Sequence, residues 1–350
     1  MKLFGTDGIR GKAGSAPLEP EMVARVGAAL VRALMDKPEG LSSQGATAPR
    51  FVIGRDTRES GTWIEEALAR GLGSEGATVV SAGVVPTPAI AYLARTEGFD
   101  AGLVISASHN PYEDNGIKVF SGSGAKITEA VEASVEQMVA ERSWTVPTQA
   151  GSIQRQDLSA CYLAHLELIL DDAGPMAGAP LVVDCANGAT AAMAPAFLRS
   201  LGFDVRAIGV NPNGRNINLN CGSTHLDGLS REVVGSGARM GIAFDGDGDR
   251  ALFIDHRGRI VDGDAVLLMG AIHLKEEGKL AGDAVVATVM SNIGLELALK
   301  DRGISLVRTA VGDKYVMEEM VKRGAAIGGE QSGHIIFPTT CLPGTASPPR

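Results

Sequence analysis

Short apolar runs rich in Val and Ile alternate with longer segments of helical spacing along most of this chain. Such alternation predicts parallel strands joined by covering helices, because a strand buried on both faces is apolar throughout, whereas a covering helix is apolar on one side. From Pro20 onwards, helical spacing separates four apolar residues, Val23, Val26, Leu30 and Leu34. The runs expected to form strands are FVIG at 51–54, TVVSAG at 78–83, AGLVIS at 101–106, IKVF at 117–120, APLVVD at 179–184, FDVRAIG at 203–209, MGIAF at 240–244, ALFID at 251–255, AVVATV at 284–289, SLVRT at 305–309 and AAIGG at 325–329. The predicted fold class is α/β, with mixed, mainly parallel sheets and helices on both faces.

These runs fall into three tandem α/β sets, and 350 residues are enough for several domains with cores of their own. The regular spacing is lost over residues 142–156, which contain turn formers, so we place the first boundary near residue 150. We expect three α/β domains and an aberrant tail, at residues 1–150, 151–255, 256–337 and 338–350.

Charge and terminal sequence exclude several classes of partner. The net charge is −9 and no cluster of Lys and Arg interrupts it, so nucleic acids and anionic membranes are poor partners. The N-terminal segment lacks the apolar core of a secretory signal, and the apolar stretch 79–94 is interrupted by Pro86 and Pro88. The four cysteines form no CxxC pair, which favours reduced thiols over a zinc site. We therefore expect a cytoplasmic protein, and the oligomeric state stays open.

Three aspartates alternate with glycine between the runs MGIAF and ALFID, which we expect to pair around them. Like charges so close together repel unless a cation neutralises them, and ligation by oxygen alone suits Mg²⁺. A calcium-binding EF-hand that started at Asp245 would need Gly at its sixth position and Glu at its twelfth, where the chain has Arg250 and His256. Asp245, Asp247 and Asp249 are therefore candidate Mg²⁺ ligands, and a solvated acidic turn is the alternative.

A serine-rich loop, SASHNP at 106–111, follows the expected strand AGLVI. Small hydroxyls and free backbone N–H groups would then lie at the carboxyl edge of a sheet, where α/β folds bind ligands. A hydroxyl there could act as a nucleophile or carry a phosphoryl group, although the same residues are also typical of an ordinary turn. The chain has no G-x-S-x-G elbow and no Walker A loop, which excludes serine hydrolases and P-loop NTPases. Lys118 lies farther along the chain, in the run IKVF. It is a candidate proton shuttle or phosphate contact, and a surface charge is the alternative.

The order of three motifs resembles the α-D-phosphohexomutase superfamily: SASHNP, then DGDGDR at 245–250, then GGEQSGH at 328–334. Further motifs are similar to the phosphoglucosamine mutases within it, namely FGTDGIRG at 4–11, CGSTH at 221–225, TVMSNIGLE at 288–296 and TAVGDKYV at 309–316. The resemblance covers residues 1–337. It implies an isomerase that interconverts glucosamine 6-phosphate and glucosamine 1-phosphate through a phosphoserine enzyme and a sugar bisphosphate, on the route to UDP-N-acetylglucosamine. Gln331 favours that substrate, and phosphomannomutase/phosphoglucomutase activity is the alternative.

The resemblance also implies roles for single residues. Ser108 would carry the phosphoryl group and share Mg²⁺ with the three aspartates. The cationic, phosphate-handling positions correspond to Arg10, His109, Lys118 and Arg250. We expect Lys118, with a pKa lowered by burial, to be the general acid and base, with His109 as the alternative. The positions that contact sugar hydroxyls correspond to Glu330 and Ser332, with His334 close by.

The C-terminal sequence departs from the family, whose members continue into a fourth domain that grips the substrate's other phosphate. We expect this chain to lack that domain. Residues 338–350 contain four Pro and show no regular spacing. Loss of one base after the Phe337 codon would explain them as out-of-frame translation, since the original frame could then encode the family's Gly-Asp-Gly near residue 344. A short natural tail is the other explanation, and a remnant with impaired activity is a further alternative for the function.

Overall fold

The computed structural model describes residues 2–35, 48–141, 143–148, 151–170, 176 and 178–337. The tail expected at 338–350 lies outside these described residues. Strands of the described chain form three sheets, with seven, five and four members. The chain divides into two compact units: the first holds residues 1–178, 183–225 and 244–249, and the second holds residues 179–182, 226–243 and 250–350.

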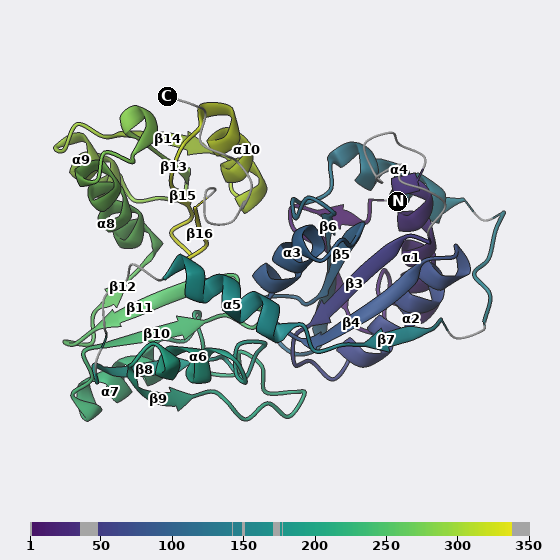
Figure 1. Cartoon of the computed structure of the whole chain (residues 1–350), viewed down its shortest axis with the longest axis horizontal. Helices are drawn as coiled ribbons and strands as arrows, with labels where there is room; N and C mark the ends of the chain where they lie inside the picture. The colour runs from purple at the N-terminus through teal and green to yellow at the C-terminus, as the bar shows by residue number, and fades with distance from the viewer. Residues whose placement is uncertain are drawn as a thin grey trace. The chain divides into compact units, whose positions relative to one another are not determined.

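The first sheet is mixed, with a parallel centre (Figure 1). In spatial order its strands are β1 (Phe4–Gly5), β2 (Gly8–Lys12), β6 (Asp114–Ser121), β5 (Ala101–Ile105), β3 (Arg50–Arg55), β4 (Thr78–Val84) and β7 (Ile153–Arg155). Strand β3 pairs in parallel with β4 and β5, whereas β6 runs antiparallel to β5 and β2. The serine loop follows β5 at the carboxyl end of this parallel centre, as the sequence predicts.

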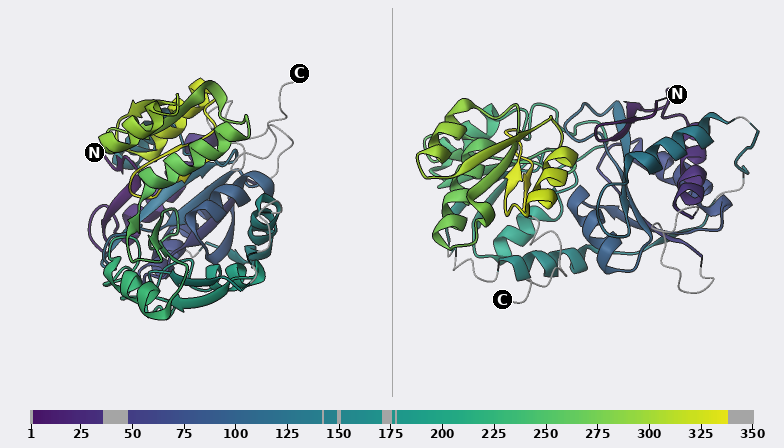
Figure 2. Two further views of the ribbon diagram at one scale, coloured as in Figure 1. Left: turned by 90° about the vertical axis from the view of Figure 1, so that its left-hand side faces the viewer. Right: turned by 90° about the horizontal axis from the view of Figure 1, so that it is seen from above.

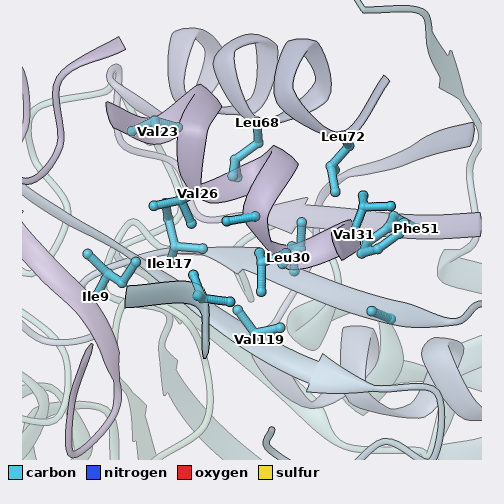
Figure 3. Packing of buried hydrophobic residues seen from close by; sticks show 14 of the residues in the cluster. Ile9, Val23, Val26, Leu30, Val31, Phe51, Leu68, Leu72, Ile117 and Val119 are labelled. Carbon is cyan, nitrogen blue, oxygen red and sulfur yellow. The ribbon is translucent and has the colours of Figure 1, made fainter. Parts of the chain in front are cut away.

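Helices cover both faces of this sheet, because successive side chains of a strand point to opposite faces. Phe51 and Ile53 of β3 belong to the core that includes α1 (Pro20–Met35), α2 (Gly61–Ser74) and α4 (Glu129–Ala140). Figure 3 shows this core, in which Val26 and Leu30 of α1 lie near Ile117 and Val119. Val52, between Phe51 and Ile53, belongs to the opposite core with α3 (Thr87–Thr96) and α5 (Ser159–Ile169). The apolar side predicted for α1 is confirmed, since its four named residues are all buried.

The second sheet has the order β12 (Ile260–Val261), β11 (Ala251–Asp255), β10 (Met240–Phe244), β8 (Pro180–Asp184) and β9 (Asp204–Ile208). The predicted pairing of MGIAF with ALFID is confirmed, because β10 and β11 are neighbours and the aspartate loop connects them. The helices of this region are α6 (Ala194–Ser200) and α7 (Asp227–Ser236).

The third sheet consists of β14 (Ser305–Thr309), β13 (Ala284–Thr288), β15 (Gly328–Gly329) and β16 (Ile335–Ile336). Its helices are α8 (Gly263–Glu276), α9 (Ile293–Lys300) and α10 (Asp313–Arg323), and a short 3₁₀ turn, η1 (Ala281–Asp283), precedes β13. Val285 packs in the core of α8 and α9, and Val286 packs against α10, so helices again cover both faces. Figure 2 shows this arrangement from two further sides. The side chains of Asp262 and Asn292 cap the starts of α8 and α9.

Some elements do not follow from the apolar pattern. Pro86 and Pro88 suggested a break, but they lie at the start of α3, where proline is tolerated because the first turn needs no amide donors. Helix α4 and the glycine-rich hairpin of β1 and β2 were not predicted either. Strand β7 follows the boundary predicted near residue 150 but pairs with β4 of the first sheet. The position of the domain boundary itself stays a prediction.

Candidate functional site

Ser108 lies in the loop after β5, with an unusual backbone conformation. Its φ is +53°, in the left-handed region that residues other than glycine seldom adopt and that is found repeatedly at functional sites. The side chain is buried, and its Oγ donates a hydrogen bond to Asp245 Oδ2 at 2.5 Å. Nδ1 of His109 lies 3.4 Å from the same Oγ. The loop therefore presents one hydroxyl directly to the aspartate loop.

The three aspartates converge as their alternating positions suggest. One carboxylate oxygen from each of Asp245, Asp247 and Asp249 lies within 4.8 Å of those of the other two. Asp245 and Asp247 are fully buried, which excludes the alternative of a solvated acidic turn. Thr87, at the start of α3, donates to Asp247 Oδ2 from its hydroxyl at 2.6 Å and to the Asp247 carbonyl from its amide at 2.8 Å.

Close approach of the two loops requires glycine at position 246. A Cβ there would lie 2.5 Å from the carbonyl oxygen of Ser108, closer than real Cβ contacts. Glycine thus lets the backbone of the aspartate loop pass directly against the serine loop.

Lys118 of β6 is buried among carboxylates and is not a surface charge. Its Nζ lies 2.7 Å from Asp249 Oδ2, 2.8 Å from Asp247 Oδ2 and 3.1 Å from Asp7 Oδ2. Burial alone would lower the pKa of Lys118, but the three carboxylates outweigh it and raise the pKa well above its usual value. The predicted lowering of this pKa is therefore wrong, and the ammonium group is protonated at neutral pH.

Asp7, between β1 and β2, connects three cations. Its carboxylate lies 2.6 Å from Arg10 Nη2, 2.6 Å from Lys126 Nζ and 3.1 Å from Lys118 Nζ. Burial would raise the pKa of Asp7, but Lys118, Lys126 and Arg10 hold it well below its usual range. Arg10 also donates to the carbonyl of Ala107 at 3.2 Å, which brings it to the serine loop.

The donor set fits a divalent cation that prefers oxygen ligands. Asp247 Oδ1 is buried and accepts no hydrogen bond in the described part of the chain. Carboxylates and a hydroxyl are the ligands that hard cations such as Mg²⁺ or Ca²⁺ bind, and the ligands that the described residues offer in this cluster are carboxylate oxygens.

The remaining predicted site residues belong to the second unit. The amide of Glu330 donates to the His334 carbonyl at 2.9 Å, which closes a tight turn before β16. The buried Glu330 carboxylate accepts a hydrogen bond from the amide of Gly312, directly before α10, at 3.1 Å. Ser332 lies within this turn, and His334 Nε2 is 3.8 Å from Asp313 Oδ2.

Arg250 lies beside the same turn in the fold of that unit. The amide of Ala251, the residue after Arg250, donates to the Gly333 carbonyl at 3.1 Å. Gln331 is exposed, and its Nε2 donates to the carboxylate of Asp262 at 2.9 Å.

Four polar residues that contact the serine loop, the aspartate loop or their cations could not be found from the sequence pattern. They are Asp7, Thr87, Arg58 and Asn218. Only Asp7 lies in one of the motifs noted in the sequence, FGTDGIRG.

No helix among the described residues is both long enough and apolar enough to cross a membrane.

Models of three successive domains match this chain. The phosphoglucomutase/phosphomannomutase alpha/beta/alpha domain I matches residues 1–145, domain II matches residues 161–258 and domain III matches residues 262–345.

Individual relatives agree with the domain matches. The phosphoglucosamine mutase of Solibacter usitatus (strain Ellin6076) is 52% identical, over 96% of this chain and 73% of the relative. The phosphoglucosamine mutase of Thermoanaerobacter sp. (strain X514) is 46% identical, over 96% of this chain and 74% of the relative. Among solved structures, a phosphoglucomutase/phosphomannomutase family protein from Burkholderia thailandensis superimposes with a TM-score of 0.81 at 26% identity, over 96% of this chain and 72% of that chain.

Proposed function

The chain belongs to the phosphoglucomutase/phosphomannomutase family of phosphohexomutase enzymes, and we propose that it interconverts glucosamine 6-phosphate and glucosamine 1-phosphate. The hydrogen bond of 2.5 Å between Ser108 Oγ and Asp245 carries this proposal, because it joins a buried hydroxyl to a cluster suited to a cation. The choice of substrate is supported by relatives named phosphoglucosamine mutase at 46–52% identity. Such a reaction supplies a precursor of UDP-N-acetylglucosamine and takes place in the cytoplasm.

The proposed cycle has two phosphoryl transfers. Phospho-Ser108 donates to the free hydroxyl of the sugar phosphate: the bond from phosphorus to Ser108 Oγ breaks, the bond to the sugar oxygen forms, and the hydroxyl proton leaves for a base. The resulting sugar bisphosphate turns over in the site and returns its other phosphoryl group to Ser108. The sugar phosphate leaves as the isomer of the one that entered.

Charge compensation is the main demand of this chemistry, because a phosphoserine brings roughly −1.5 to −2 charges. Asp245, Asp247 and Asp249 would hold Mg²⁺ together with Ser108. When bound, Mg²⁺ offsets the charge of the transferring phosphoryl group. Arg10 would contact the same group, since it is tied to the serine loop through the Ala107 carbonyl.

Charge stabilisation and proton transfer are assigned to Lys118 and His109. Lys118 is protonated among its carboxylates and is therefore suited to stabilise negative charge, whereas its raised pKa makes it a weak proton donor at neutral pH. His109, with Nδ1 at 3.4 Å from Ser108 Oγ, is the alternative group for accepting a proton.

Recognition of the sugar phosphate is assigned to the second unit. Glu330 and Ser332 would contact sugar hydroxyls, with His334 close by, and Arg250 would contact phosphate. This assignment is supported by their proximity, because these residues lie on or beside one tight turn that is held by backbone hydrogen bonds.

Turnover of glucosamine 6-phosphate tests this function. The purified chain, with Mg²⁺ and glucose 1,6-bisphosphate as activator, should form glucosamine 1-phosphate, and Ser108→Ala should abolish its formation. Binding of the sugar phosphate without turnover in the parent chain would identify a remnant without activity. Equal turnover by the parent and Ser108→Ala would contradict the proposed role of the serine.

A further inference from the structure

A fully buried arginine lies beneath the serine loop. Arg58 follows β3, and its Nη2 donates to the carbonyl of Ser108 at 3.0 Å and to that of Asn110 at 2.9 Å. Its Nη1 donates to the carbonyl of Pro111, and its Nε donates to Asp56 Oδ2 at 2.9 Å. One guanidinium group thus binds three carbonyls of a single short loop.

Asn218 binds two of the same carbonyls from a different segment. It lies between β9 and α7, and its Nδ2 donates to the Ser108 carbonyl at 2.9 Å and to the Asn110 carbonyl at 3.0 Å. Each of these carbonyls therefore accepts from both side chains. A carbonyl oxygen has two lone pairs, so its capacity for hydrogen bonds is filled.

The amide of Ser108 is fixed through the same network. It donates to Ser106 Oγ at 2.9 Å, and Ser106 Oγ donates to Asp56 Oδ2 at 2.6 Å. Asp56 is in turn paired with Arg58. Both polar backbone groups of Ser108 are therefore connected to Arg58, one directly and one through Ser106 and Asp56.

The hydrogen bonds to the backbone of Ser108 determine the direction in which its side chain points. Ser108 has a φ of +53°, a conformation that must be stabilised by its surroundings in a residue with a Cβ. Restraining its amide and carbonyl fixes the Cα–Cβ direction and so points Oγ at Asp245. The Arg58 side chain is fully buried with its donors on loop carbonyls and on Asp56, so it acts on the loop and not on a substrate.

We propose that Arg58 and Asn218 are positioning residues for phosphoryl transfer at Ser108, a role that rests on the proposed function. They hold the serine loop in the conformation that presents Oγ to the cation site. Their loss should slow the transfer step and leave the affinity for the sugar bisphosphate unchanged.

The main test is Arg58→Lys, because lysine keeps the charge opposite Asp56 but is a single ammonium that cannot match the planar fork of arginine. Phosphorylation of Ser108 by glucose 1,6-bisphosphate would be followed by rapid quenching and intact-mass measurement. The expected maximal rate is about 100-fold below that of the parent, since displacement by an ångström can cost this much. The bisphosphate concentration at half-maximal rate should not change.

Arg25→Lys is the matched control. Arg25 also donates to three carbonyls, those of Trp144, Val139 and Glu141, and none of them belongs to the serine loop. The Arg25→Lys variant should have a lower thermal unfolding temperature than the parent, as should Arg58→Lys. Its rate of Ser108 phosphorylation should equal that of the parent.

Asn218→Gly is the second variant, and it decides the proposal if Arg58→Lys does not fold. Asn218 has a φ of +58°, which glycine adopts without strain, so the backbone path can be kept. We expect a fall of roughly tenfold in the phosphorylation rate, corresponding to the loss of a hydrogen-bonding group. Amide hydrogen exchange of residues 106–111 should be faster in Arg58→Lys and Asn218→Gly, and unchanged in Arg25→Lys.

Parent-like phosphorylation rates in both variants would overturn the proposal, as would a change confined to the half-saturating concentration. A parent chain that gains no phosphoryl group would overturn the proposed function instead. Amide hydrogen exchange would then test separately whether Arg58 and Asn218 hold the loop, because it does not depend on enzyme activity. Unchanged exchange at residues 106–111 in the variants would contradict this role.

Discussion

Lys118 is the residue whose replacement should change the stability of the site most. It neutralises Asp247, Asp249 and Asp7 in a buried position. Lys118→Met keeps an unbranched side chain of similar length and removes the ammonium group that these carboxylates share. Removal of one partner from a buried ion pair costs about 3–5 kcal/mol, so we expect a loss of that size in the free energy of unfolding.

Urea unfolding with and without Mg²⁺ measures this effect. Because a divalent cation would neutralise the same carboxylates, Mg²⁺ should restore part of the stability lost in Lys118→Met. Lys126→Met, which removes a partly exposed ammonium from Asp7, is the control and should cost less. If Lys118→Met were as stable as the parent without Mg²⁺, the account of this cluster would be wrong.

The lowered pKa of Asp7 should make the free energy of unfolding depend on pH. Its pKa is held well below the ordinary value of 3.8, so the folded state favours the ionised form more than the unfolded state does. This contribution is complete at pH values above 3.8 and is lost as pH falls below it. The difference in unfolding free energy between the parent and Asp7→Asn should therefore shrink on going from pH 7 to pH 3. A difference that stayed constant, or that grew on acidification, would contradict the assignment.

The roles of Ser108 and the three aspartates in phosphoryl transfer stay predictions, but the convergence of the aspartates could be predicted because they alternate with glycine in one loop. Arg58 and Asn218 could not, since their partners are backbone carbonyls, which any sequence supplies. Those partners also lie far away along the chain: the Ser108 carbonyl is 50 positions from Arg58 and 110 from Asn218. The pKa of Lys118 was predicted in the wrong direction because burial was considered without the three carboxylates that the fold brings to it.

At the scale of elements, α1 and α2 approach each other so closely that one glycine is required. A Cβ on Gly71 of α2 would lie 1.9 Å from the carbonyl oxygen of Ala24 in α1. We expect Gly71→Ala to destabilise the fold by about 1–3 kcal/mol or more, because the helices would have to move apart.

Gly73→Ala, two residues along α2, provides the control for that prediction. A Cβ at this position would lie 3.5 Å from its nearest neighbour, an ordinary contact, and alanine favours the helix by about 0.5–1 kcal/mol over glycine. The thermal unfolding temperature of Gly71→Ala should be below that of the parent, and that of Gly73→Ala should equal or exceed it. Equal effects of the two substitutions would argue against the close packing of these helices.

Most strands could be predicted because burial on both faces leaves a continuous apolar run, as in β3, β5 and β13. Helix α3 was missed because its proline lies in the first turn, where the usual exclusion of proline does not apply. The hairpin of β1 and β2 is too short and too rich in glycine to show a strand pattern.

At the scale of the whole molecule, the three α/β sets of the sequence correspond to three sheets and to three matched domain models. The chain spans about three quarters of the length of the relatives it matches, 73% for the Solibacter protein. The serine loop, the aspartate loop and Lys118 all lie in the first unit, so the parts proposed to carry out phosphoryl transfer are held together within it.

If Ser108 carries the phosphoryl group, the modified serine can be detected by intact-mass measurement with peptide mapping. After incubation of the whole chain with glucose 1,6-bisphosphate and Mg²⁺, we expect a gain of one phosphoryl group, located on Ser108 and lost in Ser108→Ala. No gain in the parent chain, or a gain located on any other residue, would contradict it.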